Sequence, residues 1–371
     1  VIHMEQNEIL IWHGTGKEAA KAVLKAAKIE ELIDSASGGD RASAKIALKP
    51  NLVVDAPASS GATTHPELVA GTIEYLQEQG FRKIKVIEGS WVGSRTMEAC
   101  EVNGLRAVCT KYGVPFVDLQ KDSSQAYDAA GMQIRVCDEA MDGSFLINMP
   151  VLKGHCQTSI TCALKNAKGV IPNAEKRRFH TLGLHKPIAH LNTVVHWGFI
   201  LVDNLCGDLD FEEGGNPVTM NRVLGFLDPV LCDSFVCRTM GYDIREVPYI
   251  GMAERLGVGS SDLNKASIQM LNEPVAAPQK STRRIQALAR YAAPDCACSA
   301  CYGSLIYALN KLEQDFGRLS LPEQVCIGQG YRGKSGKLGV GTCTCKFAQT
   351  LGGCPPTAGD IYDFLARQMR R

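Results

Sequence analysis

The feature that most constrains the fold is a strand–helix–strand unit in the first quarter of the chain. Residues 46–48 form a short apolar run, as in a buried strand, and residues 84–87 repeat that pattern. Between them, residues 64–79 carry apolar side chains at helical spacing and stop before Gly80, a residue type that commonly ends helices. A helix that connects two buried strands is typical of a parallel sheet covered by helices, so the unit predicts an α/β fold.

The same pattern continues along the chain. Further strands are predicted at residues 8–12, 114–119, 132–136, 145–149 and 199–202, and further helices at 15–36, 95–112, 158–168, 234–240 and 248–256. Thr15 to Glu18 and Thr64 to Glu67 have the spacing of capping boxes, which begin helices. We therefore expect residues 4–275 to form a core domain, with a mostly parallel, Rossmann-like sheet and flanking helices.

A second region is expected after residue 275. Residues 272–284 contain two prolines and several polar residues without periodicity, which is typical of a domain boundary. Beyond them, residues 304–316 and 360–369 have helical patterns, and cysteines lie before and between these two segments. The sequence therefore predicts a small, cysteine-rich, α-helical domain over residues 276–371.

Size and charge exclude some functional classes. The 371 residues are enough for one large α/β domain and a smaller one. The net charge of +1 argues against a general nucleic-acid binder, which would be strongly basic. Apolar runs stay well short of the roughly 20 residues of a membrane span, and no signal sequence is recognised. We expect a cytoplasmic protein without nucleic-acid or membrane partners; its oligomeric state is not predicted.

Residues 153–190 form the most unusual segment of the predicted core domain. They follow the strand at 145–149, and their only acidic residue is Glu175. Five of the eight histidines lie between His155 and His196. Ligands of α/β sheets bind beyond the carboxyl ends of the strands. A basic, imidazole-rich segment at that position predicts a pocket for an anionic small-molecule substrate.

Candidate site residues follow from this expectation. The candidate catalytic residues are Lys153, His155, Lys165, His180 and His185, because imidazole titrates near neutral pH and lysine can hold an anion. The candidate substrate-binding residues are Lys49, Asn51, Thr64, Asn166, Lys168 and Arg178. Candidate bases or metal partners are Asp203, Asp228 and Asp233. The acidic, glycine-rich loop 207–217 is expected to close over the pocket or bridge to its lysines.

A simpler interpretation competes for two of these lysines. Lys165 and Lys168 lie near the end of the helix predicted at 158–168, where a basic side chain complements the helix dipole without any ligand. On that interpretation both are solvated helix-end charges.

The cysteines suggest a metal centre in the C-terminal region. Seven of the fifteen cysteines lie in the last fifth of the chain: Cys296, Cys298, Cys301, Cys326, Cys343, Cys345 and Cys354. In a reducing compartment such density points to metal rather than disulfides. Three thiols within six residues, and a cysteine followed by proline at Cys354, are typical of iron–sulfur loops. The residues favour an iron–sulfur cluster, and a four-thiolate zinc site is the alternative.

Several motifs together resemble a known family. They are KPNLV (49–53), TTHPELV (63–69), EGSWVG (88–93), NMPVLKGH (148–155), ALKNAKGVIP (163–172), DPVLCDSFVCRTMGYD (228–243), CSAC (298–301), GVGTC (339–343) and GCPP (353–356). Over nearly its whole length the chain resembles the family catalogued as domain of unknown function 362. The resemblance implies a [4Fe–4S] centre beside an α/β domain. By position it implies Cys298, Cys301, Cys343 and Cys354 as ligands, with Cys296 and Cys345 as alternates.

Three functions are consistent with these features. The first is an iron–sulfur oxidoreductase that acts on an anion held near Lys153 and His155. The second is an iron–sulfur electron carrier that has a redox protein partner and no substrate of its own. The third is a non-redox transferase or isomerase whose C-terminal metal is structural.

Overall fold

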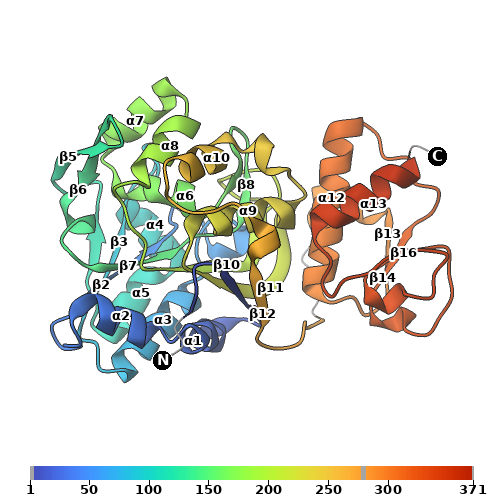
Figure 1. The fold of residues 1–371 in the computed structure, drawn as a ribbon, viewed down its shortest axis with the longest axis horizontal. Helices are drawn as coiled ribbons and strands as arrows, with labels where there is room; N and C mark the ends of the chain where they lie inside the picture. Colours follow the sequence, from blue (N-terminus) through green and yellow to red (C-terminus); the bar gives the residue numbers. More distant parts are fainter. Residues whose placement is uncertain (1–3, 277–280, 370–371) are drawn as a thin grey trace.

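A mixed α/β core with one large, mostly parallel sheet is confirmed by the computed structural model, which describes residues 4–276 and 281–369 (Figure 1). The sheet has the strand order β12-β1-β11-β10-β7-β2-β3-β4. Its strands are β1 (Glu8–His13), β2 (Lys45–Pro50), β3 (Lys83–Glu88), β4 (Phe116–Asp118), β7 (Phe145–Met149), β10 (Phe199–Asp208), β11 (Pro217–Phe226) and β12 (Ser267–Met270). Within this sheet, β11 runs antiparallel to both of its neighbours, and the other pairs are parallel.

The order of the parallel strands creates a binding crevice. After β2, the chain adds β3 and β4 on one side, and it then adds β7 and β10 on the other side of β2. The order β4-β3-β2-β7-β10 is the order of the first five strands in a doubly wound sheet. In such sheets the connections on the two sides diverge at the switch point, here between β2 and β7, and leave a crevice at the carboxyl ends of the strands.

Helices cover both faces of the sheet (Figure 1). Along β2, Ile46 and Leu48 belong to one buried apolar cluster and Ala47 belongs to another, because successive side chains of a strand point to opposite faces. The first cluster includes side chains of α1 (Gly16–Ala27), α2 (Ile29–Ser37), α3 (Pro66–Glu78), α4 (Thr96–Asn103) and α5 (Leu105–Tyr112). The second includes side chains of α6 (Ala163–Asn166), α7 (Asn173–Leu182), α8 (His185–Leu191), α9 (Pro229–Met240) and α10 (Pro248–Arg255). None of the described helices is long and apolar enough to cross a membrane.

Several predicted boundaries differ from the structure. The helix predicted at 15–36 breaks at Lys28, whose φ is 51°, and the helix predicted at 95–112 breaks at Gly104, whose φ is 90°. The helix predicted at 158–168 is wrong in its first half, where β9 (Ser159–Thr161) pairs with β8 (Lys153–His155) in a hairpin. Neither predicted capping box forms. The N-cap residues are Thr15 in α1 and His65 in α3, and neither side chain makes a cap hydrogen bond.

The sequence had suggested a purely helical C-terminal region, but the structure contains strands there as well. It contains α11 (Arg283–Ala289), α12 (Ser299–Phe316) and α13 (Ala358–Met369) together with a parallel sheet of β13 (Ala292–Pro294), β14 (Val325–Ile327), β15 (Leu338–Val340) and β16 (Gln349–Leu351). These strands are three residues each, too short to show a periodic pattern. Strands β13, β14 and β16 lie on the far side of α12 from the large sheet (Figure 1). The predicted boundary at 272–284 includes residues 277–280, which lie outside the described residues.

Candidate functional site

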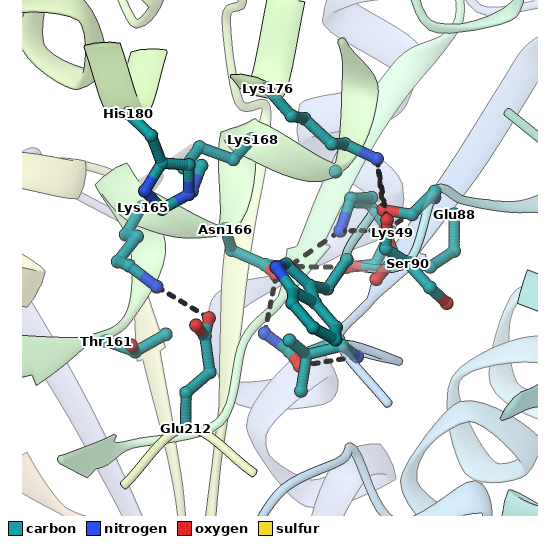
Figure 2. Close-up of a pocket in the computed structure, with 15 residues that line it drawn as sticks. Lys49, Glu88, Ser90, Thr161, Lys165, Asn166, Lys168, Lys176, His180 and Glu212 are labelled. Carbon is teal, nitrogen blue, oxygen red and sulfur yellow. Dashed lines mark hydrogen bonds and ion pairs between the residues drawn. The ribbon is translucent and has the colours of Figure 1, made fainter. Parts of the chain in front are cut away.

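A lysine-lined cavity lies at the carboxyl ends of β2 and β3, beside the switch point (Figure 2). We call it the lysine pocket. It is lined by Lys49, Asn51, Val53, Glu88, Gly89, Ser90, Trp91, Thr161, Lys165, Asn166, Lys168, Gly169, Lys176, His180 and Glu212. The enclosed space is about 50 Å³, which suits a few water molecules or one small anion.

A buried ion pair joins the ends of β2 and β3. Lys49 Nζ lies 2.8 Å from Glu88 Oε1, and both side chains are almost completely buried. Glu88 also accepts hydrogen bonds from the backbone amides of Leu52 (2.9 Å) and Gly89 (2.7 Å). Burial lowers the pKa of Lys49, and the Glu88 carboxylate opposes that shift. The pair fixes one wall of the lysine pocket.

Lys176 reaches the pocket from α7, and among the described residues its hydrogen-bond partners include no carboxylate. Its Nζ donates to the backbone carbonyls of Gly89 and Ser90, each at 2.8 Å. Burial lowers its pKa to about 8, and Glu88 opposes the shift. A buried ammonium held by carbonyl dipoles is well placed to bind an anion.

Lys168 and His180 lie side by side in Figure 2, with Lys168 Nζ 3.3 Å from His180 Nε2. Burial and then the nearby Lys165 lower the pKa of Lys168 to about 7. Burial, followed by Lys168, lowers the pKa of His180 as well. Burial disfavours a positive charge on both groups, and the contact between their nitrogens gives a proton a direct path from one to the other.

Glu212, on the acidic loop, bridges to the basic segment as the sequence predicted. Its carboxylate lies 2.5 Å from Lys165 Nζ and 3.0 Å from His155 Nε2. Its backbone carbonyl accepts a hydrogen bond of 2.9 Å from Lys153. Burial favours the neutral acid, but Lys165 and the other cations hold the pKa of Glu212 well below its usual range. Lys165 is buried against this carboxylate, so its interpretation as a solvated helix-end charge is wrong.

His155 is held as a neutral imidazole. Its Nδ1 accepts hydrogen bonds from the backbone amides of Gln157 (3.0 Å) and Thr158 (3.1 Å), so the ring proton resides on Nε2 and is donated to Glu212. Burial and then Lys165 lower the pKa of His155. His155 and Lys153 therefore position Glu212 and do not line the pocket themselves.

Asparagines connect the two sides of the switch point. Asn51, after β2, donates to Asn166 Oδ1 at 3.0 Å, and Asn166 donates to Asn148 Oδ1 of β7 at 2.7 Å. The short helix α6 that carries Asn166 begins where Asp233 accepts the backbone amides of Ala163 (2.8 Å) and Leu164 (3.2 Å). Buried amide side chains with matched partners keep the crevice in one geometry.

The charge balance of the lysine pocket favours an anion. Four lysines and two carboxylates line it, so two more cations than anions face the same small space when all are ionised. The walls also leave little room: a Cβ atom on Gly169 would lie 2.2 Å from Glu88 Oε1. A small anion would compensate the excess charge at low solvent exposure, where electrostatic attraction is strong.

Several predicted residues lie elsewhere. Thr64 donates to the carbonyl of Met149 (2.8 Å) and accepts from the amide of Asn51 (2.8 Å). Arg178 pairs with Glu175, and His185 packs against Tyr249 with ring centroids 5.7 Å apart. None of the three predicted residues lines the lysine pocket.

The later aspartates have structural partners. Asp228 caps α9, accepting the amides of Val230 and Leu231 at 2.7 and 3.0 Å. Asp233, Cys162 and Cys232 place ligand atoms within 4.8 Å of one another. The Asp233 oxygens, however, already hold α6, and burial raises the pKa of Asp233 to about 7. We assign this group a structural role.

Sequence reasoning missed five polar residues of the lysine pocket as specific site residues: Glu88, Ser90, Thr161, Lys176 and Glu212. Glu88 ends β3 and Ser90 follows it. The rule that ligands bind at the carboxyl ends of strands, which identified Lys49, could therefore have found both. Lys176 and Glu212 carried a weaker signal, because they reach the pocket only through tertiary packing.

A second cavity, which we call the cysteine cavity, lies in the C-terminal region and has a volume of about 270 Å³. Its cysteines are Cys298, Cys301, Cys343 and Cys354, while Cys296, Cys326 and Cys345 are not part of its lining. Cys298 is the N-cap of α12, and Cys301 lies in the first turn of that helix. Cys343 and Cys354 follow Gly341 (φ 92°) and Gly353 (φ 119°), where the left-handed backbone favours glycine.

Polar groups around the cysteine cavity favour a thiolate at Cys298, whereas neighbouring cysteines and burial raise the pKa values of Cys301 and Cys354. Gln329 Nε2 donates to Cys298 Sγ at 3.2 Å. Hydrogen bonds from Cys301 and Gln329, with the nearby Arg332, lower the pKa of Cys298 to about 6 although burial opposes the shift. A hydrogen bond to Cys343 raises the pKa of Arg332. The positive end of the α12 dipole lies at the same place.

Two comparisons relate the chain to known proteins. A sequence model described as "Domain of unknown function (DUF362)" matches residues 46–238, which include every residue of the lysine pocket. The thylakoid-associated protein sll1697 of Synechocystis sp. (strain ATCC 27184 / PCC 6803 / Kazusa) is 24% identical over 234 residues, with 59% of this chain and 69% of that protein covered.

Proposed function

The chain belongs to the family described as domain of unknown function (DUF362), and from this premise we propose that it is a [4Fe–4S]-cluster-binding oxidoreductase acting on a small anion. The observation that carries the proposal is that Cys298, Cys301, Cys343 and Cys354 line one cavity. Four thiolates are the usual donor set of such a cluster. When bound, the cluster would supply one-electron transfer.

The spacing of the four sulfurs supports a cluster over zinc. Bonds from zinc to cysteine sulfur are about 2.3 Å long, so the ligands of one zinc ion crowd around a single point. Among the described residues, the potential ligands that converge within 4.8 Å are Cys162, Cys232 and Asp233, and the four cysteines of the cavity do not form such a group. A larger inorganic core suits a lining that encloses about 270 Å³.

The lysine pocket would bind the anionic substrate. Lys49, Lys165 and Lys176 would hold its charge, and the substrate would take over contacts that Glu212 now makes with Lys165. Lys168 and His180 would move the proton that accompanies reduction, since their nitrogens are in hydrogen-bond contact and the pKa of Lys168 is lowered to about 7. The carboxylic acid or phosphate class of anion suits this lysine-rich lining.

A second candidate is an electron carrier without a substrate of its own, with a redox protein as its partner. Cys354 is exposed and Cys343 is half-buried, so a cluster in the cysteine cavity would lie near the surface. In Figure 1, β14 and β16 lie at the opposite end of the molecule from β2 and β3, whose ends carry the lysine pocket. This separation favours transfer to a protein docked at the C-terminal region.

The cluster is tested by anaerobic reconstitution. We expect about four iron and four sulfide per chain in the unmodified protein. Cys343→Ser should lose most of that iron, and Cys345→Ser, a matched control two residues away, should retain it. Zinc alone in the purified protein, or equal iron in both variants, would overturn the proposal.

Anion binding is tested separately by calorimetric titration with sulfate and succinate. Lys176→Met should weaken binding about 10-fold or more, because a hydrogen bond to a charged group contributes roughly 1.5–3 kcal/mol. Lys186→Met removes an exposed lysine outside the lysine pocket and should leave affinity unchanged. If the anion binds equally well to Lys176→Met and to the unmodified protein, the lysine pocket is not the anion site. With the cluster present, that result would favour the electron-carrier candidate.

A further inference from the structure

A third cavity is lined by a cysteine and a histidine, and a buried aspartate lies behind the histidine. Cys206 Sγ lies 3.9 Å from His65 Nε2, and His65 Nδ1 lies 2.8 Å from Asp203 Oδ2. His65 and Cys206 line a cavity of about 360 Å³, within the usual range for small-molecule sites. This cavity has no lining residue in common with the lysine pocket or the cysteine cavity.

The imidazole is fixed at two points. His65 is the N-cap of α3, and its backbone amide donates to the same Asp203 Oδ2 at 2.7 Å. Asp203 is fully buried, and its other oxygen accepts the amide of Leu205 at 3.1 Å. The carboxylate therefore sets the ring so that Nε2 faces the sulfur, which is the role of the third member in nucleophile–histidine–acid triads.

Electrostatics favour a protonated His65. Burial lowers the pKa of His65, but the Asp203 carboxylate outweighs burial and raises it to about 11. The ring is then an imidazolium at neutral pH. A cysteine hydrogen-bonded to an imidazolium is stabilised as the nucleophilic thiolate.

The surrounding backbone is irregular in a way that is common beside active sites. Between Asn204 and Cys206 the pairing of β10 with β11 shifts, so that three steps along β11 oppose two steps along β10. Asn221, which lines the cavity, takes a left-handed φ of 48° at this irregularity. Thr15 and Gly16, at the start of α1, complete one side, where the amides of a helix N-terminus favour developing negative charge.

We propose that Cys206, His65 and Asp203 form a second active site, which accepts an acyl group from an ester or thioester. The Cys206 thiolate attacks the carbonyl carbon, a C–S bond forms, and the bond from that carbon to the leaving oxygen or sulfur breaks. The electron pair departs with the leaving group, which takes the Nε2 proton of His65. Asp203 is the positioning residue. This site does not depend on the cluster or on the lysine pocket.

The test is acetylation of the full-length protein by p-nitrophenyl acetate, with release of p-nitrophenolate and peptide mass spectrometry as readouts. We expect acetyl on the Cys206 peptide and its loss in Cys206→Ala. His65→Gln should slow acetylation of Cys206 at least 10-fold, as expected for loss of acid–base assistance. Cys156, which is exposed, is the internal reference, and Cys156→Ala should leave Cys206 acetylation unchanged.

A measurement on the unmodified protein covers the case in which His65→Gln fails to fold. The Cys206 thiol, although 9% exposed, should be alkylated by iodoacetamide at least as fast as the exposed Cys156. Acetyl confined to exposed cysteines, or a Cys206 that reacts only after denaturation, would overturn the proposal.

Discussion

Lys49 Nζ lies 2.8 Å from Glu88 Oε1, and both side chains are almost completely buried, so the carboxyl ends of β2 and β3 are joined by a buried ion pair. Removal of one partner leaves the other charge buried and unpaired, which typically costs more than the pair contributes. The pair therefore couples the stability of the core to the geometry of the lysine pocket.

Glu88→Gln should lower the free energy of unfolding by roughly 3–5 kcal/mol, because Lys49 would lose its counter-charge in a buried position. Urea denaturation measures the change. The control is Glu74→Gln, which removes a carboxylate paired with Lys17 and Lys21 at the surface, and its cost should be about 1 kcal/mol or less. Equal costs for the two variants would contradict a special role for the buried pair.

Gly169→Ala should destabilise the protein by about 1–3 kcal/mol, because its Cβ would lie 2.2 Å from Glu88 Oε1 and 2.5 Å from Lys49 Nζ. It should also reduce sulfate affinity. In Gly251→Ala, the new Cβ on α10 meets only the end of Arg255 at 3.4 Å, so this variant should be neutral or stabilising by up to roughly 1 kcal/mol. Thermal unfolding compares the two, and similar melting temperatures would contradict the tight fit at Gly169.

Sulfate affinity should fall as pH rises from 7 to 9. The pKa of Lys168 is lowered to about 7, and burial lowers that of Lys176 to about 8. A bound dianion favours the protonated lysines, so binding is strongest below these values and is lost as protons leave above them. Sulfate keeps its charge over this range, which makes calorimetry at several pH values a direct test.

Lys168→Met should weaken sulfate binding at pH 6.5 and should differ much less from the unmodified protein at pH 9, where Lys168 is already neutral. Lys186→Met should retain the full pH dependence. An affinity that stays constant from pH 6.5 to 9 would show that these lysines do not bind the anion.

Arg332→Gln should lower the reduction potential of a cluster in the cysteine cavity. Arg332 and Cys343 line the same cavity, and a nearby positive charge stabilises the reduced, more negative cluster. Potentiometric titration followed by electron paramagnetic resonance measures the shift. Lys334→Gln removes an exposed lysine paired with Asp295 outside the cavity lining, and its potential should stay near that of the unmodified protein.

The sequence by itself determined the class of fold and the regions where sites could lie. Apolar periodicity identified β2, α3 and β3, because strand and helix patterns are local properties of the chain. The rule that ligands bind at the carboxyl ends of strands identified Lys49 and Asn51 as pocket candidates, and both line the lysine pocket.

Only the tertiary structure decided which of these groups meet. Glu212 reaches Lys165, and Cys206 reaches His65, because the strand order brings together segments that are distant along the chain. The same packing excludes His185 and Arg178 from the lysine pocket, although their residue types and segment matched the expectation. Sequence spacing does not encode such contacts, because they depend on strand order and on which charged side chains the fold removes from water.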